Sequence, residues 1–285
     1  MNRDRSPRPA LRYGIYLPPM GPLGDPAALV DLAVRAEASG WDGVFLWDHV
    51  LTEFPPIADT WTTLGAIAAA TNKILLGPMV TPLPRRRPWV VARQASTVSR
   101  LSGGRLVLGA GLGADETGDF ARFGETAAMS ERKAMLESGL DIVRAMWSGS
   151  SYRHHGSCYD VEIDASDPEP HRIPIWTAAA NLSPGVLARA ARSDGVYYNP
   201  EDHEATPEEV ATLIEGVRRA GLPSSATFEV AVRGNASSAW PGSEPDNVDL
   251  AGLAEAGATW WMEGLIYFDP LGMSLAVVDA GPPGR

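Results

Sequence analysis

Short apolar segments alternate with longer segments of helical periodicity along most of the chain. The apolar segments begin roughly 31 residues apart, with one longer and one shorter interval, as expected for repeated strand–helix units. Strands that alternate with helices in this way predict a parallel sheet, and eight of them favour a closed (β/α)8 barrel, or TIM barrel, over an open α/β sheet. The expected strands are Leu11–Leu17, Gly43–Trp47, Ile74–Val80, Arg105–Ala110, Ile173–Ala179, Gly195–Tyr198, Thr227–Val232 and Thr259–Ile266.

The first expected helix illustrates the helical signals. Asp25 is a suitable N-cap, Pro26 stands at the first helical position, and Gly40 is a suitable terminator. From Leu29 to Ala36, apolar residues at positions i, i+3, i+4 and i+7 form one apolar stripe. By the same signals we expect helices from Pro88 to Gly103–Gly104, from Glu131 to Trp147 and from Pro207 to Gly221.

Two segments fall outside the strand–helix repeat. Residues 1–10, MNRDRSPRPA, are polar and contain prolines, which predicts a loose N-terminal tail. Residues 148–172, between the fourth and fifth strands, are too irregular for a helix. We interpret this excursion either as a functional loop or as a surface hairpin that covers the barrel rim. The remaining chain predicts one barrel domain over residues 11–285.

Composition narrows the classes of function. The net charge of −11 argues against an extended nucleic-acid-binding surface and against binding to anionic membranes. The first residues lack the apolar segment of a signal peptide, and no run approaches the roughly 18 apolar residues of a membrane span. Cys158 has no second cysteine to pair with, which favours a reducing, cytoplasmic compartment.

In barrels of this kind the active site lies at the carboxyl ends of the strands. The second strand ends in Trp47, Asp48 and His49. Such a carboxylate and imidazole can hydrogen-bond a polar cofactor or exchange a proton with it, or they can simply cap and pack a turn. The third strand runs into a proline-rich segment followed by Arg85–Arg87, which either bind a phosphate or carboxylate or form a solvated surface.

The fourth and fifth strands end in small residues. Gly109–Gly113 is not a dinucleotide fingerprint, and its glycines either let the backbone approach a large flat group or form a turn. The small residues Ala178–Asn181 precede Ser183, where a helix N-terminus either binds a phosphate or is simply capped. The strand ends lack lysine, which disfavours a Schiff-base aldolase. His154 and His155 lack metal-ligand spacing, so no metal is expected.

Taken together, the strand ends resemble the luciferase-like monooxygenase superfamily, which includes bacterial luciferase and the enzymes that use the deazaflavin coenzyme F-420. The resemblance is clear over about residues 11–200 and rests on four segments. These segments are GWDGVFLWDHV, ILLGPMVTPLPRRRPWVVARQASTVSRLSGGRLVLGAGLG, DFARFGE followed by ERKAMLESGLDIVRAMWSG, and RIPIWTAAA with ARAARSDGV.

The resemblance implies a deazaflavin, coenzyme F-420, bound at the barrel mouth, with FMN as the alternative cofactor. Asp48 and His49 resemble the Asp-His pair of deazaflavin-dependent members and are the expected catalytic residues. A non-prolyl cis peptide is implied at either Pro78–Met79 or Met79–Val80, where a bulge presses against the ring. The expected cofactor-binding residues are Pro78, Met79, Val80, Thr81, Gly111 and Gly113, with Ala179, Ala180, Asn181 and Ser183 at the cofactor phosphate.

The chain departs from the superfamily's sugar-phosphate dehydrogenases, which carry a glutamate after the fourth strand. Here that position is Ala114, and Asp115 and Glu116 lie one and two residues further on. This departure favours a hydride-transfer oxidoreductase acting on a small organic substrate. We expect Trp47, Trp176 and Tyr197 to line the substrate pocket.

Two other functions stay open from the sequence. One is an FMN-dependent two-component monooxygenase fed by a separate flavin reductase, and the other is a non-catalytic flavin-binding protein. The resemblance also implies a homodimer, which is common in the superfamily.

Overall fold

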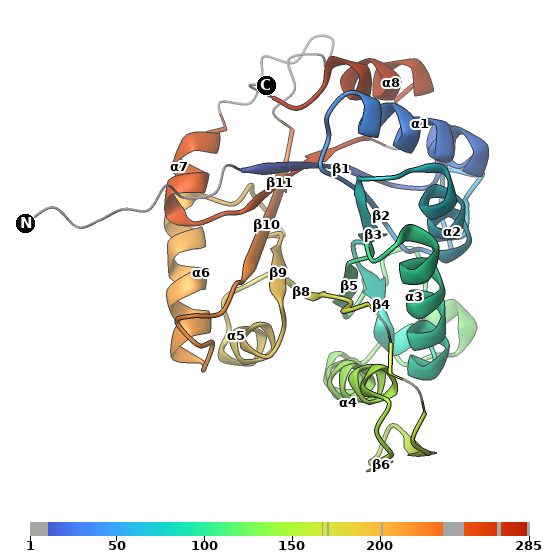
Figure 1. The fold of residues 1–285 in the computed structure, drawn as a ribbon, viewed down its shortest axis with the longest axis vertical. Helices are drawn as coiled ribbons and strands as arrows, with labels where there is room; N and C mark the ends of the chain where they lie inside the picture. The colour runs from blue at the N-terminus through green and yellow to red at the C-terminus, as the bar shows by residue number, and fades with distance from the viewer. Residues whose placement is uncertain are drawn as a thin grey trace, which may run out of the picture.

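The computed structural model describes residues 11–166, 168–169, 171–200, 202–235, 248–266 and 269–283. The tail predicted over residues 1–10 lies outside the described residues. In the described part of the chain, a parallel sheet curls into a barrel with helices around its outside (Figure 1).

The barrel sheet has the order β3-β2-β1-β11-β10-β9-β8-β5-β4, and all its pairings are parallel. Its strands are β1 (Arg12–Leu17), β2 (Gly43–Leu46), β3 (Leu75–Pro78), β4 (Thr81–Pro82), β5 (Leu108–Gly111), β8 (Ile175–Ala179), β9 (Gly195–Tyr198), β10 (Glu229–Gly234) and β11 (Trp260–Gly264). Each of the eight predicted strands overlaps one of these strands. The third, Ile74–Val80, overlaps β3, but its last residues Met79 and Val80 are not in a strand, and β4 follows them. The predicted fold class is therefore confirmed.

The split third strand closes the barrel. Residues Met79 and Val80 interrupt it, so β3 pairs with β2 on one side and β4 pairs with β5 on the other. Two backbone hydrogen bonds complete the seam below the break: the amide of Leu76 donates to Arg105 O at 3.2 Å, and the amide of Val107 donates to Leu76 O at 2.9 Å.

The predicted helices are present with their predicted signals. Asp25 caps α1 by accepting from the amide of Ala27 at 2.9 Å, and the stripe from Leu29 to Ala36 is the buried face of this helix. The α-helices are α1 (Pro26–Ala38), α2 (Thr60–Ala70), α3 (Pro88–Ser102), α4 (Met129–Ser148), α5 (Pro184–Ala191), α6 (Pro207–Arg219), α7 (Leu250–Ala256) and α8 (Leu271–Ala280), and the short 3-10 turns are η1 (Gly21–Leu23), η2 (Leu83–Arg85) and η3 (Ala121–Phe123).

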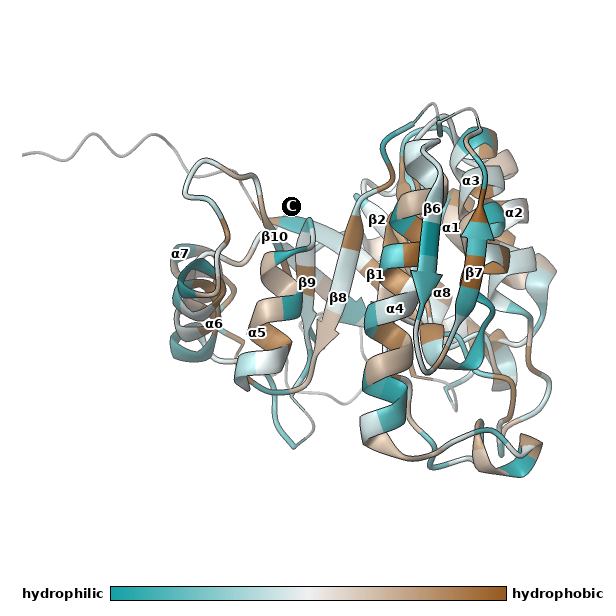
Figure 2. Ribbon diagram, turned by 90° about the horizontal axis from the view of Figure 1, so that it is seen from below, coloured by the Kyte–Doolittle hydropathy of each residue, from teal (hydrophilic) through white to brown (hydrophobic). Residues whose placement is uncertain are grey.

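The excursion between the fourth and fifth predicted strands forms a hairpin outside the barrel sheet. Its antiparallel strands are β6 (Tyr152–His155) and β7 (Asp160–Ile163), and the hairpin lies beside α4 (Figure 2). The Tyr159 ring meets the Trp89 ring of α3 edge-on, with 6.2 Å between centroids. The excursion is thus a surface hairpin that packs on the helix layer.

Alternate residues of each barrel strand point inward, as the pleat of a strand requires. Phe45, Trp176 and Trp260 fill the middle of the barrel, with ring centroids 5.6–5.8 Å apart. Tyr16 and Tyr197 belong to the same interior cluster but also face the cavity described below. The barrel is therefore packed with aromatic rings, and these two tyrosines lie at the top of that packing.

Candidate active site

A cavity of about 520 Å³ opens at the carboxyl ends of the barrel strands. Its wall comes from the ends of β1, β2, β5, β8, β9 and β10, from the Met79–Val80 break, and from helices α4 and α5. The predicted residues in this wall are Trp47, Asp48, His49, Met79, Val80, Gly113, Ala179, Ala180, Asn181, Ser183 and Tyr197. The cavity thus collects most of the predicted site.

Four predicted residues lie behind the wall. Trp176 is the clearest correction, because it is 2% exposed and packs between Phe45 and Trp260 in the aromatic interior. It shares the inward face of β8 with Ala178, but it stands two residues earlier and therefore one layer deeper than the cavity wall.

Pro78, Thr81 and Gly111 also support the wall from outside. The buried Thr81 hydroxyl donates to Asp48 Oδ2 at 2.9 Å and accepts from the Trp61 indole at 3.1 Å. A Cβ on Gly111 would lie 2.5 Å from the Val80 side chain and 3.1 Å from Ala178. The glycine therefore makes room for the break in the neighbouring strand.

The Met79–Val80 peptide bond is cis, which agrees with one of the two bonds predicted from the resemblance. Met79 is 1% exposed and belongs to the aromatic interior, whereas Val80 is partly exposed at the cavity. A Cβ on Gly109 would lie 2.2 Å from the carbonyl oxygen of Pro78, so this glycine lets the broken strand lie close to β5.

Asp48 is held in a buried cluster of ion pairs. Arg86 contacts it through two nitrogens, with Nε at 2.9 Å from Oδ2 and Nη2 at 2.6 Å from Oδ1. Arg85 donates through Nη2 to the Asp48 carbonyl oxygen at 2.8 Å and lies 3.3 Å from Oδ1. The side chains of Asp48 and Arg85 are 1% and 6% exposed. These arginines are therefore neither a solvated surface nor free to bind an anion, and Asp48 is fixed as their counter-ion.

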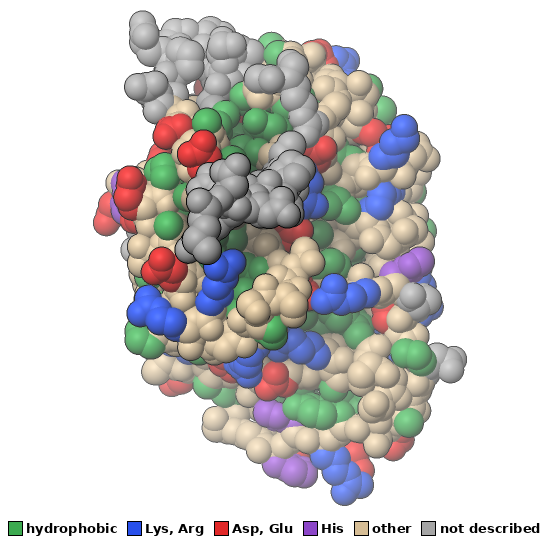
Figure 3. Space-filling view, turned by 60° about the vertical axis from the view of Figure 1, so that its left-hand side comes forward, with side chains coloured by type: hydrophobic (Ala, Val, Ile, Leu, Met, Phe, Trp, Pro, Cys, Tyr) green, Lys and Arg blue, Asp and Glu red, His purple; other side chains and the backbone are tan. Residues whose placement is uncertain are grey.

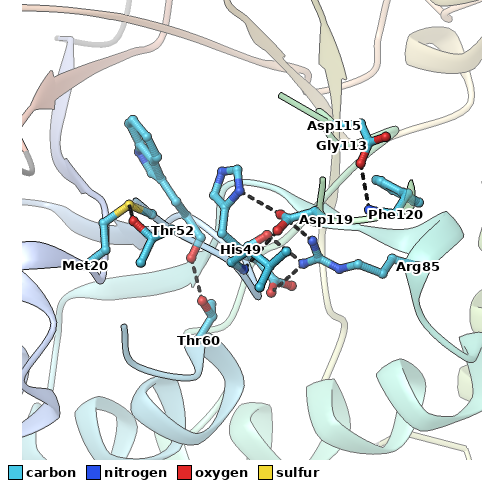
Figure 4. A network of polar contacts seen from close by, with 12 residues as sticks. Met20, His49, Thr52, Thr60, Arg85, Gly113, Asp115, Asp119 and Phe120 are labelled. Carbon is cyan, nitrogen blue, oxygen red and sulfur yellow. Dashed lines mark hydrogen bonds and ion pairs between the residues drawn. The ribbon is translucent and has the colours of Figure 1, made fainter. Parts of the chain in front are cut away.

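His49 is oriented by Asp119, one of the acidic residues that follow the fourth predicted strand. Asp119, in the loop after β5, has Oδ2 at 2.8 Å from His49 Nδ1 and at 2.7 Å from Arg85 Nη1 (Figure 4). Its Oδ1 accepts from the Leu51 amide at 2.9 Å. Because Nδ1 is engaged, Nε2 is the ring nitrogen of His49 that is available to a molecule in the cavity.

Two buried tyrosines form part of the cavity wall on the side of β1 and β9. Burial raises the pKa of Tyr16, an effect partly offset by the neighbouring Tyr197 hydroxyl and by Arg233. Burial, together with Tyr16, raises the pKa of Tyr197 well above its usual value. Both hydroxyls therefore keep their protons at ordinary pH and can donate hydrogen bonds to a molecule in the cavity. Sequence reasoning missed Tyr16, although the alternation along β1 would have placed it inward.

The wall near α5 is built from small residues and cations. Ser183 occupies the N-cap position, but its side chain makes no capping hydrogen bond, and its amide instead donates to Asn181 Oδ1 at 3.1 Å. Arg189 is 5% exposed and donates through Nη1 to Glu137 at 3.0 Å. Within the described residues, its Nε has no hydrogen-bond partner. Lys133 of α4 also lines the cavity, so a lysine is present there although it lies on no strand end.

Acidic residues after β5 do not supply the carboxylate missing at Ala114. Ala114 lines the cavity, whereas Asp115 turns into its own loop and accepts from the amides of Phe120 at 2.7 Å and Ala121 at 3.3 Å. The structure therefore gives Asp115 a local role. In the described part of the chain, no group of three or more His, Cys, Asp or Glu side chains could hold a metal ion. No helix there is long and apolar enough to cross a membrane.

Comparison with known proteins identifies the family that this barrel and cavity suggest. The model of the family described as luciferase-like monooxygenase matches residues 11–244. The chain belongs to this family.

Its relatives include proteins named F-420-dependent glucose-6-phosphate dehydrogenase. That of Microbacterium testaceum is 30% identical over 205 residues, covering 69% of this chain and 60% of the relative. That of Nakamurella multipartita is 28% identical over 229 residues, covering 75% of this chain and 64% of the relative. The chain thus spans less than two thirds of the length of these relatives.

Solved structures share the fold over nearly the whole chain. An F-420-dependent secondary alcohol dehydrogenase, solved with an F-420-acetone adduct, has a TM-score of 0.74 at 18% identity and covers 96% of this chain and 98% of its own. The tetrahydromethanopterin reductase of Methanopyrus kandleri has a TM-score of 0.71 at 18% identity, with 95% and 98% coverage. A monooxygenase of Streptomyces bottropensis has a TM-score of 0.71 at 21% identity, with 94% and 96% coverage.

Proposed function

We propose that this protein is a coenzyme F-420-dependent oxidoreductase that transfers a hydride between the deazaflavin and a small organic substrate. The observation that carries the proposal is His49, which Asp119 holds by Nδ1 at 2.8 Å in the wall of the barrel-mouth cavity. The relatives named F-420-dependent dehydrogenases support the choice of cofactor.

The residues of the cavity fit such a cofactor. A volume of about 520 Å³ lies within the range of cofactor and ligand pockets. The phosphate-bearing part of the cofactor would be held near Ala179–Ser183 at the start of α5, where Arg189 presents a buried Nε without a partner among the described residues. The ring would lie against Val80, which faces the cavity from the broken strand.

When bound, the deazaflavin would supply the hydride chemistry, and the protein supplies position and proton handling. His49 keeps Nε2 toward the cavity because Asp119 accepts from Nδ1, so Nε2 accepts a proton when the ring is neutral and donates one when it is charged. Tyr16 and Tyr197 are poorer proton donors because their pKa values are raised. Asp48 holds Arg85 and Arg86 and thereby fixes the backbone that presents His49.

The reaction differs from that of the relatives named glucose-6-phosphate dehydrogenase. The position of the glutamate carried by that class is Ala114 here, and Asp115 is turned away into its loop. We therefore propose hydride transfer in which His49, rather than a carboxylate after β5, carries the proton. We also propose that residues 11–285 form one barrel domain and that the protein acts in the cytoplasm, as its single cysteine favours.

Fluorescence titration of the purified protein with F-420 and, separately, with FMN tests the proposal. We expect saturable binding of F-420 and at least tenfold weaker binding of FMN. Tight binding of FMN alone would replace the proposal with a monooxygenase that depends on a separate reductase. Binding of neither cofactor would show that the cavity does not hold a flavin or deazaflavin, and the proposed redox function would be wrong. F-420 binding without turnover under anaerobic screening would leave a non-catalytic binding protein.

A further inference from the structure

Arg233 enters the cavity from a side that the cofactor proposal does not use. It lies near the end of β10 opposite Met262 of β11, and Met262 belongs to the barrel interior. Ala231, two residues earlier, is also interior. The alternation of the strand therefore directs Arg233 inward at the barrel mouth, where it lines the cavity.

A neutral partner orients this arginine. Asn199, which follows β9 and also lines the cavity, accepts from Arg233 Nε at 2.7 Å. An amide oxygen orients the guanidinium without cancelling its charge, and this bond uses one of the five N–H donors of the group. The hydroxyls of Tyr16 and Tyr197 lie in the same part of the wall.

Arg233 differs from the other arginines of the site in its charge balance. Arg85, Arg86 and Arg189 each pair with a carboxylate, whereas Arg233 makes no ion pair with any described residue. The nearby acid Glu263 faces away, because it is fully buried and accepts from the Trp261 indole at 2.8 Å. Arg233 thus brings to the cavity a positive charge that pairs with no carboxylate of the described residues.

This charge stands out against the rest of the protein. The chain carries a net charge of −11, and in the face drawn in Figure 3 the blue basic side chains are mixed with red acidic ones. Among the described residues, the cavity wall instead combines Arg233 with Lys133, while Arg189 pairs with Glu137 and the carboxylate Asp48 pairs with Arg85 and Arg86. A cavity with this wall favours anionic molecules.

We propose that Arg233, oriented by Asn199, binds an oxyanion group of the substrate, either a carboxylate or a phosphate. The inference rests on the proposed function, because a cofactor phosphate placed near Arg189 and α5 leaves Arg233 for the second molecule in the cavity. In the barrel order, β11 and β1 separate β10 from β2, and His49 lies in the segment that follows β2. The substrate would therefore present its anion to Arg233 and its reacting carbon toward His49 and the ring.

The test is a fluorine NMR titration of trifluoroacetate into the protein saturated with F-420, with the neutral isostere trifluoroacetamide as the matched probe. We expect trifluoroacetate to bind at least tenfold more tightly than the amide, because charge-assisted hydrogen bonds to a guanidinium are about twice as strong as neutral ones. Arg233→Gln should remove this preference, and Arg233→Lys should keep most of it. The control Arg219→Gln, on the outer helix α6, should change nothing.

Displacement of trifluoroacetate by acetate and by methyl phosphate then distinguishes a carboxylate from a phosphate substrate. Retention of the anion preference in Arg233→Gln would overturn the inference, as would its loss in Lys133→Gln alone. Loss of F-420 affinity in Arg233→Gln, with an unchanged unfolding temperature, would assign Arg233 to the cofactor and also overturn it. If F-420 does not bind at all, the proposed function fails, and the same titration without cofactor still decides whether Arg233 holds the anion.

Discussion

The two sides of the barrel mouth use arginine in opposite ways. On the side of β2 and β4, Arg85 and Arg86 are 6% and 18% exposed and are paired with Asp48 and Asp119. On the side of β9 and β10, Arg233 is exposed and donates to the neutral amide of Asn199, without an ion pair to any residue that the structure describes. A buried arginine that is neutralised by neighbouring carboxylates fixes the backbone around it. An exposed arginine with a neutral partner is available to bind a ligand.

The comparison shows that an arginine's exposure and its ion pairs, and not its residue type, decide whether it supports the fold or binds a ligand. Three consecutive arginines in the sequence suggested an anion site or a solvated surface, and two of them are neither. The arginine that we propose to bind an anion, Arg233, lies outside this run, near the end of β10. Variants of four residues in and behind the cavity wall separate structural support from chemical roles. Their expected effects decrease in the order His49, Asp48, Asp119 and Tyr197.

Replacing His49 should abolish most turnover while leaving the cofactor bound. We expect His49→Ala to lower kcat by about 10²–10⁴, the usual contribution of a positioned proton carrier. The matched control is His155→Ala, because His155 also meets a carboxylate through Nδ1, at 2.7 Å from Asp160, but on the exposed hairpin. Steady-state kinetics with F-420 measure both, and unchanged turnover in His49→Ala would refute its role.

Removing Asp48 should destabilise the fold more than removing an exposed ion-pair partner. Asp48→Ala leaves the buried Arg86 guanidinium without its carboxylate, while Arg85 keeps Asp119, and should cost about 3–5 kcal/mol of unfolding free energy. Glu162→Ala, which breaks the exposed pair with Arg153, should cost less than about 1 kcal/mol. Urea unfolding measures the difference in unfolding free energy. Equal losses would show that the buried ion pairs stabilise the fold no more than the exposed pair does.

Asp119 should act through the tautomer of His49. In Asp119→Asn the amide can donate to Nδ1, which would move the imidazole proton to Nε2 and lower kcat by about 10–100-fold. Nitrogen NMR of the labelled histidine distinguishes the two tautomers, and a change in packing alone would not exchange them. A variant that keeps the proton on Nδ1 while losing activity would contradict this role.

The tyrosines of the cavity should give a small, pH-dependent effect. Because the pKa of Tyr197 is raised, above pH 10 the folded protein keeps this proton while the unfolded chain loses it, and stability falls as pH rises. Tyr197→Phe should flatten this fall by up to about 1.4 kcal/mol per pH unit and change nothing below pH 10. Urea unfolding between pH 9 and 11 measures it, and an unchanged slope would mean that Tyr197 ionises like an exposed tyrosine.

The barrel could be predicted because its signals are local. Each apolar segment is bounded by polar, glycine or proline residues, and α1 shows its cap, stripe and end within 16 residues, from Asp25 to Gly40. The site was predictable as far as the strand ends were recognised, which placed His49, Val80 and Ala180 in the cavity wall.

The remaining features depend on depth and on distant partners. Trp176 points into the barrel as predicted but lies below the cavity. The alternation along a strand predicts whether a side chain points inward, and it does not predict the depth of that side chain along the barrel axis. Asp119 meets His49 across 70 positions of sequence, through a loop whose path no periodicity encodes. The glycines of β5 are required because the broken neighbouring strand lies too close for a side chain. This close contact exists only in the folded barrel and leaves no pattern in the sequence.

The alternation of inward residues also has a consequence for how such a protein can diverge. Phe45, Trp176 and Trp260 pack the barrel interior, while Asn199 and Arg233 lie at the open end, where they continue the inward faces of β9 and β10. Substitutions at these two positions can therefore change which molecule the cavity accepts and leave the aromatic packing below them intact. A combinatorial library limited to these two codons would sample new substrates on an unchanged scaffold.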